Sequence, residues 1–180
     1  LIPDPEVRKR LMPELFRCDM DEFFATCEIF ADCPELHGLL VVSDQAESHN
    51  MLHYLYTEAK ATLMTDAYLV KEDTSLHTLH NFIKGENYLN SSWTSALPEN
   101  RLHIIYLAVD PCLQHHGIAA EMLDEAIAYA DSRGMMVSLE THNEHNVPFY
   151  ANFGFEVYKV QEYNFPLKQY CLVRQAKKAE

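Results

Sequence analysis

The chain has 180 residues and a formal net charge of −13, from 14 Lys and Arg against 27 Asp and Glu. This length predicts one domain with a substantial core. The negative charge argues against binding to nucleic acid, because phosphates need a basic surface. No continuous apolar run approaches the roughly 18 residues of a membrane span, and the N-terminal residues do not resemble a signal peptide. We therefore expect a cytoplasmic protein without a membrane partner.

The cysteine and histidine spacings do not indicate a metal site. Five cysteines occur without any Cys-x-x-Cys pair, which argues against a zinc knuckle or a dithiol redox motif. His49 with His53, and His77 with His80, have spacings that place two rings on one helix face. Neither pair has the glutamate of an H-E-x-x-H motif, and no third ligand is indicated. We expect no metal.

The first hundred residues are expected to be mostly helical. Apolar residues at helical spacing predict three helices, over residues 6–16, 21–30 and 47–64. Pro13 is expected to interrupt the first of them. Short apolar runs then predict two strands, at residues 67–70 and 79–83, and the polar stretch 87–100 is expected to be a loop.

The second half has a clearer pattern of alternating elements. An apolar, β-branched run predicts a strand over 102–109, and an amphipathic pattern predicts a helix over 118–133 that ends at Gly134. Further along the chain we expect a strand, a short helix with Asn146 as its N-cap, and two closing strands, over residues 136–141, 146–153, 155–160 and 168–173. This order indicates a mixed α/β sheet.

The junction between the first of these strands and its helix has the features of an anion site. A glycine, Gly117, stands where the helix begins, so backbone N–H groups and the helix dipole can converge on one point. Glycine allows a ligand close to the backbone, and Ala119 is small enough not to block it. An ordinary tight strand-to-helix turn would also explain the residues. The stretch is neither a Walker loop nor a G-x-G-x-x-G motif.

Two motifs in this half resemble those of one enzyme family. Gln114-x-x-Gly117-x-Ala119 is similar to the Gln/Arg-x-x-Gly-x-Gly/Ala signature with which GNAT acetyltransferases hold the pyrophosphate of CoA. The segment 146–155, Asn-Val-Pro-Phe-Tyr-Ala-Asn-Phe-Gly-Phe, resembles the second motif of the family. The resemblance covers about residues 102–174. It implies a single domain over 1–180, with a helical, substrate-side half (1–100) and an acetyl-CoA-binding half (101–175).

The resemblance also implies a fold and a set of site residues. The fold would be a central mixed, mostly antiparallel sheet flanked by helices. Tyr150 matches the general acid of the family, and Glu140 is a candidate general base, although a solvated strand-end charge explains Glu140 equally well. Either Asn143 or Asn146 would contact the cofactor. The remaining cofactor contacts would come from Leu107, Ala108, Val109, Gln114, His115, His116, Gly117, Ile118, Ala119 and Ala120.

The implied function is an N-acetyltransferase that moves an acetyl group from acetyl-CoA, its co-substrate, to a primary amine of a small molecule or peptide. The amine would attack directly and form a tetrahedral intermediate, which a backbone N–H near Val109 would stabilise. The alternative is a non-catalytic acyl-CoA-binding sensor or regulatory module. The sequence is compatible with a monomer or a homodimer.

Overall fold

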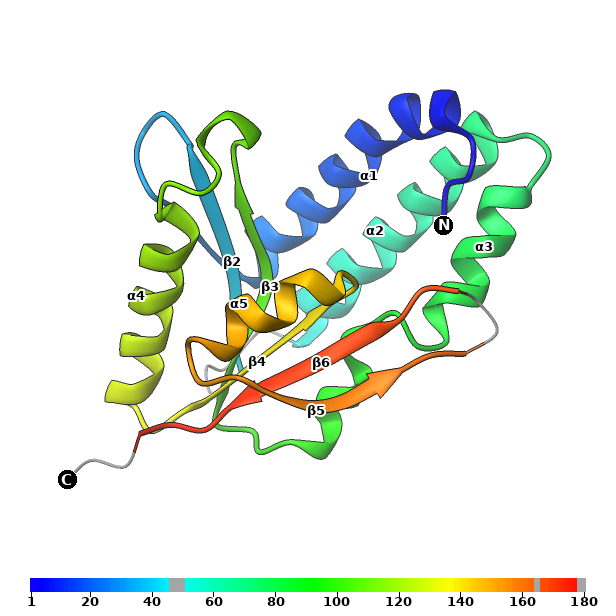
Figure 1. Ribbon diagram of the computed structural model, residues 1–180. Coiled ribbons are helices and arrows are strands. Elements are labelled where there is room, and N and C mark those ends of the chain that lie inside the picture. Colours follow the sequence, from blue (N-terminus) through cyan, green and yellow to red (C-terminus); the bar gives the residue numbers. More distant parts are fainter. Residues whose placement is uncertain (46–50, 164–165, 178–180) are drawn as a thin grey trace. The chain divides into compact units, whose positions relative to one another are not determined.

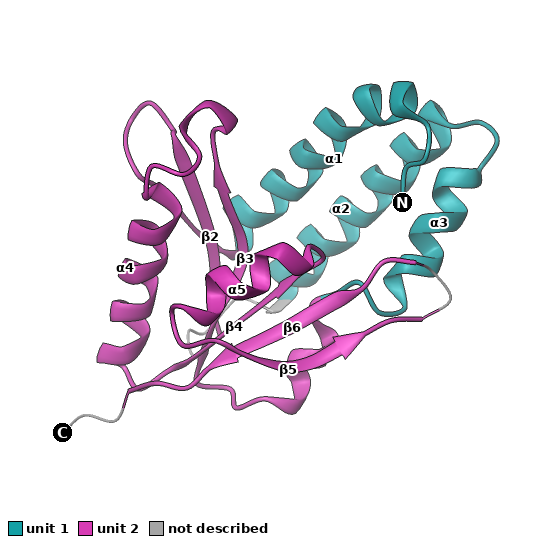
Figure 2. Ribbon diagram, viewed as in Figure 1, with its two compact units in different colours: residues 1–26, 49–90 teal, residues 27–48, 91–180 magenta. Residues whose placement is uncertain are grey.

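The computed structural model describes residues 1–45, 51–163 and 166–177 (Figure 1). The chain divides into two compact units (Figure 2). We call residues 1–26 and 49–90 the helical unit, and residues 27–48 and 91–180 the sheet unit. Among the described residues, no helix combines the length and apolar character needed to cross a membrane.

The helical unit contains α1 (Pro5–Thr26), α2 (Met51–Glu72) and α3 (His77–Glu86). Asp4 caps the start of α1, since its carboxylate accepts the N–H groups of Glu6 and Val7. The core of this unit is formed by four buried side chains, Ile2, Leu11, Leu15 and Leu69. The helical character expected for this part of the chain is confirmed.

Three local predictions for the helical unit are wrong. Pro13 does not end its helix, because Leu11 and Leu15 are buried on either side of it and hold α1 together across the missing hydrogen bond. The strands expected at 67–70 and 79–83 lie inside α2 and α3. A short apolar run can be a strand or the buried side of a helix, and its pattern does not distinguish the two. Leu69, which is 1% exposed, lies on the buried side of α2.

The sheet unit is built on six strands in the order β1-β2-β3-β4-β6-β5. Their bounds are β1 (Glu28–Ala31), β2 (Gly38–Asp44), β3 (Arg101–Val109), β4 (Met136–Thr141), β5 (Glu156–Gln161) and β6 (Gln169–Arg174). Within the described part of the chain, the β3–β4 pair alone is parallel and the other four pairs are antiparallel. The mixed, mostly antiparallel sheet expected from the sequence is therefore confirmed.

The first two strands were not predicted. The helix expected over 21–30 ends at Thr26, and the chain then pairs Glu28–Ala31 with β2. Phe24 and Phe30, which fit an apolar helix stripe by their spacing, are 75% and 51% exposed. The stretch expected as a loop over 87–100 contains a 3₁₀ helix, η1 (Ser91–Ala96).

Two helices, α4 (Ile118–Ser132) and α5 (Val147–Ala151), cover one face of the sheet. Both contribute to a single core with the inward side chains of the strands, which are Leu40, Val42, Leu102, Ile104, Val137, Leu139 and Leu172. Gly134 follows α4 with a φ of 63°, as expected for a helix stop. Residues on the opposite face of β3 and β4, such as His103 and Ser138, are polar and buried.

Candidate functional site

The site begins where β3 and β4 separate. The two strands pair only as far as Ile104 and Leu139 among the described residues, whereas β3 continues to Val109 and β4 to Thr141. Figure 1 shows the two strands diverging beyond this point. The last residues of β3 keep their pairing with β2 on the other edge, up to Val109 opposite Gly38. One edge of β3 from 105 to 109 thus faces a gap that an extended ligand chain can line. The predicted contacts Leu107, Ala108 and Val109 lie along it.

The loop after β3 leads to an uncapped helix N-terminus. Gly117 occupies the N-cap position of α4 with a φ of 94° and offers no side chain to the first turn. The first helical hydrogen bond of α4 runs from the N–H of Glu121 to the carbonyl of Gly117. The N–H groups of Ile118, Ala119 and Ala120 therefore come before the first i to i−4 hydrogen bond of the helix. A Cβ on Gly117 would meet no atom within 4 Å. Open space before free N–H groups suits an anion.

The other residues of this loop are exposed and hold its shape. The side-chain amide of Gln114 donates to the carbonyl of Val109 at 3.3 Å, which ties the loop back to the end of β3. His115 adopts a φ of 66°, and Nδ1 of His116 lies 2.9 Å from the carbonyl oxygen of Gln114. No residue from Cys112 to Ala120 is acidic, so the strongly negative chain leaves this loop without local repulsion of an anion.

Tyr150 lies on α5 and is 9% exposed. Its ring packs edge-on against Phe149 and Phe155, with centroids 5.2 and 5.8 Å away. Burial raises the pKa of the Tyr150 hydroxyl. A raised pKa keeps the hydroxyl protonated at neutral pH, which is the state that a proton donor requires.

The two candidate asparagines flank the turn between β4 and α5. Asn143 accepts the N–H of His145 at 3.1 Å and so caps the short helix η3 (Glu144–Asn146). Asn146 precedes α5, but its side chain makes no capping bond; it donates to the hydroxyl of Thr141 at 3.3 Å. Asn146 thus stands at the N-cap position of α5, as predicted, but without the side-chain capping bond. Both side chains are exposed, and both remain candidates for cofactor contacts.

Glu140 is held in a cluster of polar side chains on the sheet face opposite α4 and α5. One oxygen accepts the hydroxyl of Ser91, and the other accepts the indole N–H of Trp93 at 3.0 Å. Nε2 of His103 lies 3.3 Å from the same carboxylate, and Nδ1 of His103 lies 2.9 Å from the hydroxyl of Ser138. We call these five residues the Glu140 cluster.

The cluster changes the chemistry expected of Glu140. Burial acts to raise the pKa of its carboxyl, but His103, Ser91 and Trp93 together outweigh burial and hold that pKa below its usual value. A carboxylate stabilised in this way accepts a proton less readily than a free one. Sequence reasoning missed Ser91 and Trp93 because they lie 49 and 47 residues away along the chain. Trp93, the single tryptophan in a polar stretch, was the available signal.

We expect Glu140→Gln to destabilise the sheet unit at neutral pH. The folded-state pKa of this carboxyl is lowered, so its stabilising contribution is complete above the unfolded value, about 4.3, and is lost as the pH falls through the folded value. The variant loses hydrogen bonds to a charged group, and the new amide can place an N–H against the indole N–H of Trp93, which needs an acceptor. We therefore expect the free energy of unfolding to fall by about 2 kcal/mol at pH 7. Urea unfolding at pH 7 and pH 3 measures the difference.

The matched control is Glu156→Gln, which removes a charge from an exposed position on β5. This control should unfold like the wild type at both pH values. If Glu140→Gln lowered the free energy of unfolding equally at pH 3 and pH 7, the effect would come from altered packing and not from the lost charge of Glu140.

Among the described residues, one group of side chains has the donors and spacing of a metal site. The ligand atoms of Asp32, Cys33 and His37, in the turn between β1 and β2, lie within 4.8 Å of one another. This group was not predicted. His77 and His80 are exposed on α3, and His49 of the other histidine pair lies outside the described residues.

Comparisons with known proteins agree on one family. The family model described as "Acetyltransferase (GNAT) family" matches residues 11–155. A solved structure from Corynebacterium glutamicum, described as histone acetyltransferase HPA2 and related acetyltransferase, is similar over 99% of this chain and 81% of its own, with a TM-score of 0.62 and 14% identity. This likeness concerns the fold. No curated protein matches the chain significantly.

Two other solved structures match a smaller part of the chain. The ribosomal-protein-S18-alanine N-acetyltransferase from Escherichia coli is 20% identical over 45% of this chain, with a TM-score of 0.41. Ard1 from Thermoplasma volcanium is 20% identical over 46% of this chain, with a TM-score of 0.40. The matched parts span only 57% and 59% of those two proteins.

Proposed function

Because the chain belongs to the GNAT family and is an acyltransferase, we propose that it transfers an acetyl group from acetyl-CoA to a primary amine of a small molecule or peptide. The observation that carries this proposal is the combination of the β3–β4 gap with the uncapped N-terminus of α4, the helix that follows β3 after the loop 110–117. The gap can hold an extended arm, and the helix end can hold the phosphates of the same molecule.

The proposal assigns the binding of acetyl-CoA to backbone groups. The N–H groups of the loop from His115 to Ala120 would bind the pyrophosphate, aided by the dipole of α4, a 15-residue helix. The edge of β3 from Leu107 to Val109 would pair with the pantetheine arm, as an added strand does. A backbone N–H of this edge would also stabilise the oxyanion when the amine attacks the thioester carbonyl.

We assign the two proton transfers to the side chains of Tyr150 and Glu140. Tyr150, buried and protonated, would donate to the thiolate that leaves from CoA. The attacking amine must lose a proton, and Glu140 at the end of β4 would receive it within the Glu140 cluster. Since the pKa of Glu140 is lowered, we propose that this acceptor is weak and that the amine enters largely in its neutral form.

A screen for acetyl-CoA consumption tests this function. Purified protein is incubated with acetyl-CoA and a panel of amines, polyamines, aminoglycosides and peptide N-termini, and both free CoA and N-acetylated product are measured. The proposal predicts that at least one amine yields the two products in equal amounts. Tight acetyl-CoA binding without turnover on any primary amine would instead support the non-catalytic sensor.

A further inference from the structure

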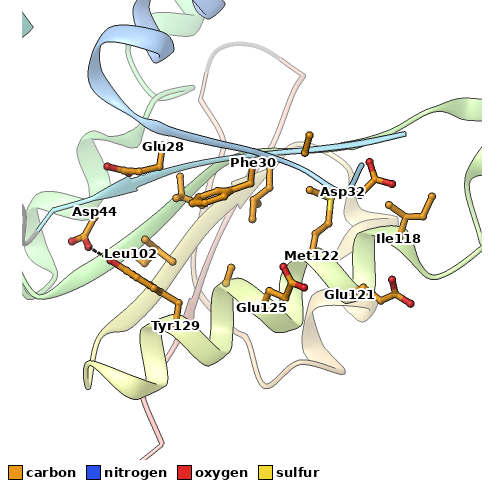
Figure 3. A pocket seen from close by; sticks show the side chains of 14 residues that line it. Glu28, Phe30, Asp32, Asp44, Leu102, Ile118, Glu121, Met122, Glu125 and Tyr129 are labelled. Atoms are coloured by element: carbon orange, nitrogen blue, oxygen red, sulfur yellow. Dashed lines mark hydrogen bonds between the residues drawn. The ribbon is translucent and has the colours of Figure 1, made fainter. Parts of the chain in front are cut away.

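A cavity of about 380 Å³ lies between α4 and the first two strands of the sheet unit (Figure 3). Glu28 and Phe30, which alternate along β1 and so face the same way, form its β1 side together with Ala31 and the following Asp32. Its α4 side extends from Ile118 to Tyr129. Of the residues that we assign to acetyl-CoA and acyl transfer, only Ile118 lines this cavity. The cavity is therefore lined almost entirely by residues outside the proposed acetyl-CoA site.

The cavity combines an apolar floor with acidic walls. Buried side chains form the floor, namely Leu40, Val42, Leu102, Met122 and Ala126. Five carboxylates stand around it, and the described residues that line it include no Lys, Arg or His. The rings of Phe30 and Tyr129 add aromatic surface, which can face a cation or a flat apolar body.

Two of the five carboxylates already have partners within the fold. Asp44 accepts the hydroxyl of Tyr129 at 2.9 Å and lies 3.6 Å from Arg133. Asp32 accepts the N–H of Gly38 at 2.6 Å and lies 3.7 Å from His37. These bonds explain why both carboxylates are tolerated beside apolar side chains.

The other three carboxylates are available to a ligand. Glu121 and Glu125 are exposed, one turn apart on α4, and Figure 3 shows them on the helix side of the cavity. Glu28 stands opposite on β1, and its Oε2 is buried with no hydrogen-bond partner among the described residues. A buried carboxylate oxygen without a donor is costly unless a ligand supplies one.

We propose that this cavity binds an amphipathic organic cation, an ammonium group carried on an aromatic or alkyl body. The body would pack on the apolar floor and lose its contact with water. The ammonium would donate to Glu28, Glu121 and Glu125, which satisfies the buried oxygen of Glu28. Anionic ligands are repelled by the same five charges, and a neutral ligand leaves the charge of Glu28 uncompensated.

Calorimetric titration in the absence of CoA tests the site with three probes that share one ring. We expect 2-phenylethylammonium to bind with one site per chain. The neutral 2-phenylethanol should bind roughly tenfold more weakly or worse, since it lacks the charge that the carboxylates attract. Phenylacetate should not bind. Equal affinity for the alcohol and the amine, or no binding of the amine, would overturn the proposal.

Paired variants of α4 locate the binding. The double variant Glu121→Gln/Glu125→Gln removes two exposed charges at the cavity and should lower the amine affinity roughly tenfold or more. Asp124→Asn removes an exposed charge from the same helix outside the cavity lining and should leave the affinity unchanged. Thermal unfolding of all variants checks their folding.

Two outcomes of these titrations would separate this site from other binding. Unchanged amine affinity in the double variant would place the amine elsewhere, for example at the acceptor position, and would overturn the cavity proposal without touching acetyl transfer. Calcium binding that the same double variant abolishes, together with no amine binding, would show a metal site and would also overturn it.

Discussion

Gly117→Glu is expected to abolish binding of acetyl-CoA. The new side chain would enter the open space before α4, where a Cβ meets no atom within 4 Å, and would place a negative charge among the N–H groups that we assign to the pyrophosphate. Two like charges about 4 Å apart at a protein surface repel by roughly 4 kcal/mol, which corresponds to a Kd higher by about a thousandfold. Calorimetry with CoA measures the change.

Gly134→Glu is a matched control for this experiment. Gly134 lies at the other end of α4, also has a positive φ, and also has no atom within 4 Å of an added Cβ. The control therefore also forces a side chain into a left-handed backbone conformation, at a cost of about 1 kcal/mol, and adds the same charge. Its CoA affinity should equal that of the wild type. Unchanged CoA affinity in a folded Gly117→Glu protein would contradict the placement of the phosphates.

Tyr150→Phe is expected to lower kcat by about a hundred- to ten-thousandfold, the usual range for general acid–base catalysis. The ring contacts with Phe149 and Phe155 do not depend on the hydroxyl, so the melting temperature and the CoA affinity should change little. Steady-state kinetics on the true amine substrate, together with calorimetry, separates these effects. Tyr158→Phe, which removes the same atom from a half-exposed residue of β5, should retain wild-type kcat.

The pH profile of the wild type gives a second measure of Tyr150. Burial raises the pKa of its hydroxyl above the ordinary value of about 10, and the donor is lost as the pH rises through that raised pKa. The rate limb assigned to this donor should therefore fall only above pH 10 or so, and it should be absent in Tyr150→Phe. Wild-type turnover by the Phe variant would mean that Tyr150 only packs in the core.

The sheet half of the fold could be predicted from sequence because its signals are local. The strand 102–109, the helix that ends before Gly134 and the strand 136–141 each have a clear apolar pattern between defined stops, and they match β3, α4 and β4. The strand β1 was missed because its four residues follow an apolar helix pattern without a break. Its identity as a strand comes from pairing with β2, which is a non-local interaction.

The candidate site likewise has one part that could be predicted from local sequence and one part that could not. The geometry of the loop before α4 could be predicted because Gly117, the preceding strand and the following helix are adjacent in sequence, and the anion binding that we propose there uses backbone groups. The setting of Glu140 could not be predicted. Its pKa depends on Ser91 and Trp93, which are brought to it by the fold, and on His103 from the neighbouring strand. Alternation along β4 puts Glu140 on the face opposite the core residues Val137 and Leu139, but it does not identify the partners of Glu140.

The most direct test of the account is a single-turnover experiment with enzyme in excess over acetyl-CoA labelled in its acetyl group. Without amine, we predict that the label stays on acetyl-CoA and that the intact mass of the protein is unchanged. With the acceptor amine, the label should pass from acetyl-CoA to the amine in one phase, which Tyr150→Phe slows. Label that first accumulates on the protein and then moves to the amine would contradict direct attack, and label that never leaves acetyl-CoA with any amine would contradict acetyl transfer itself.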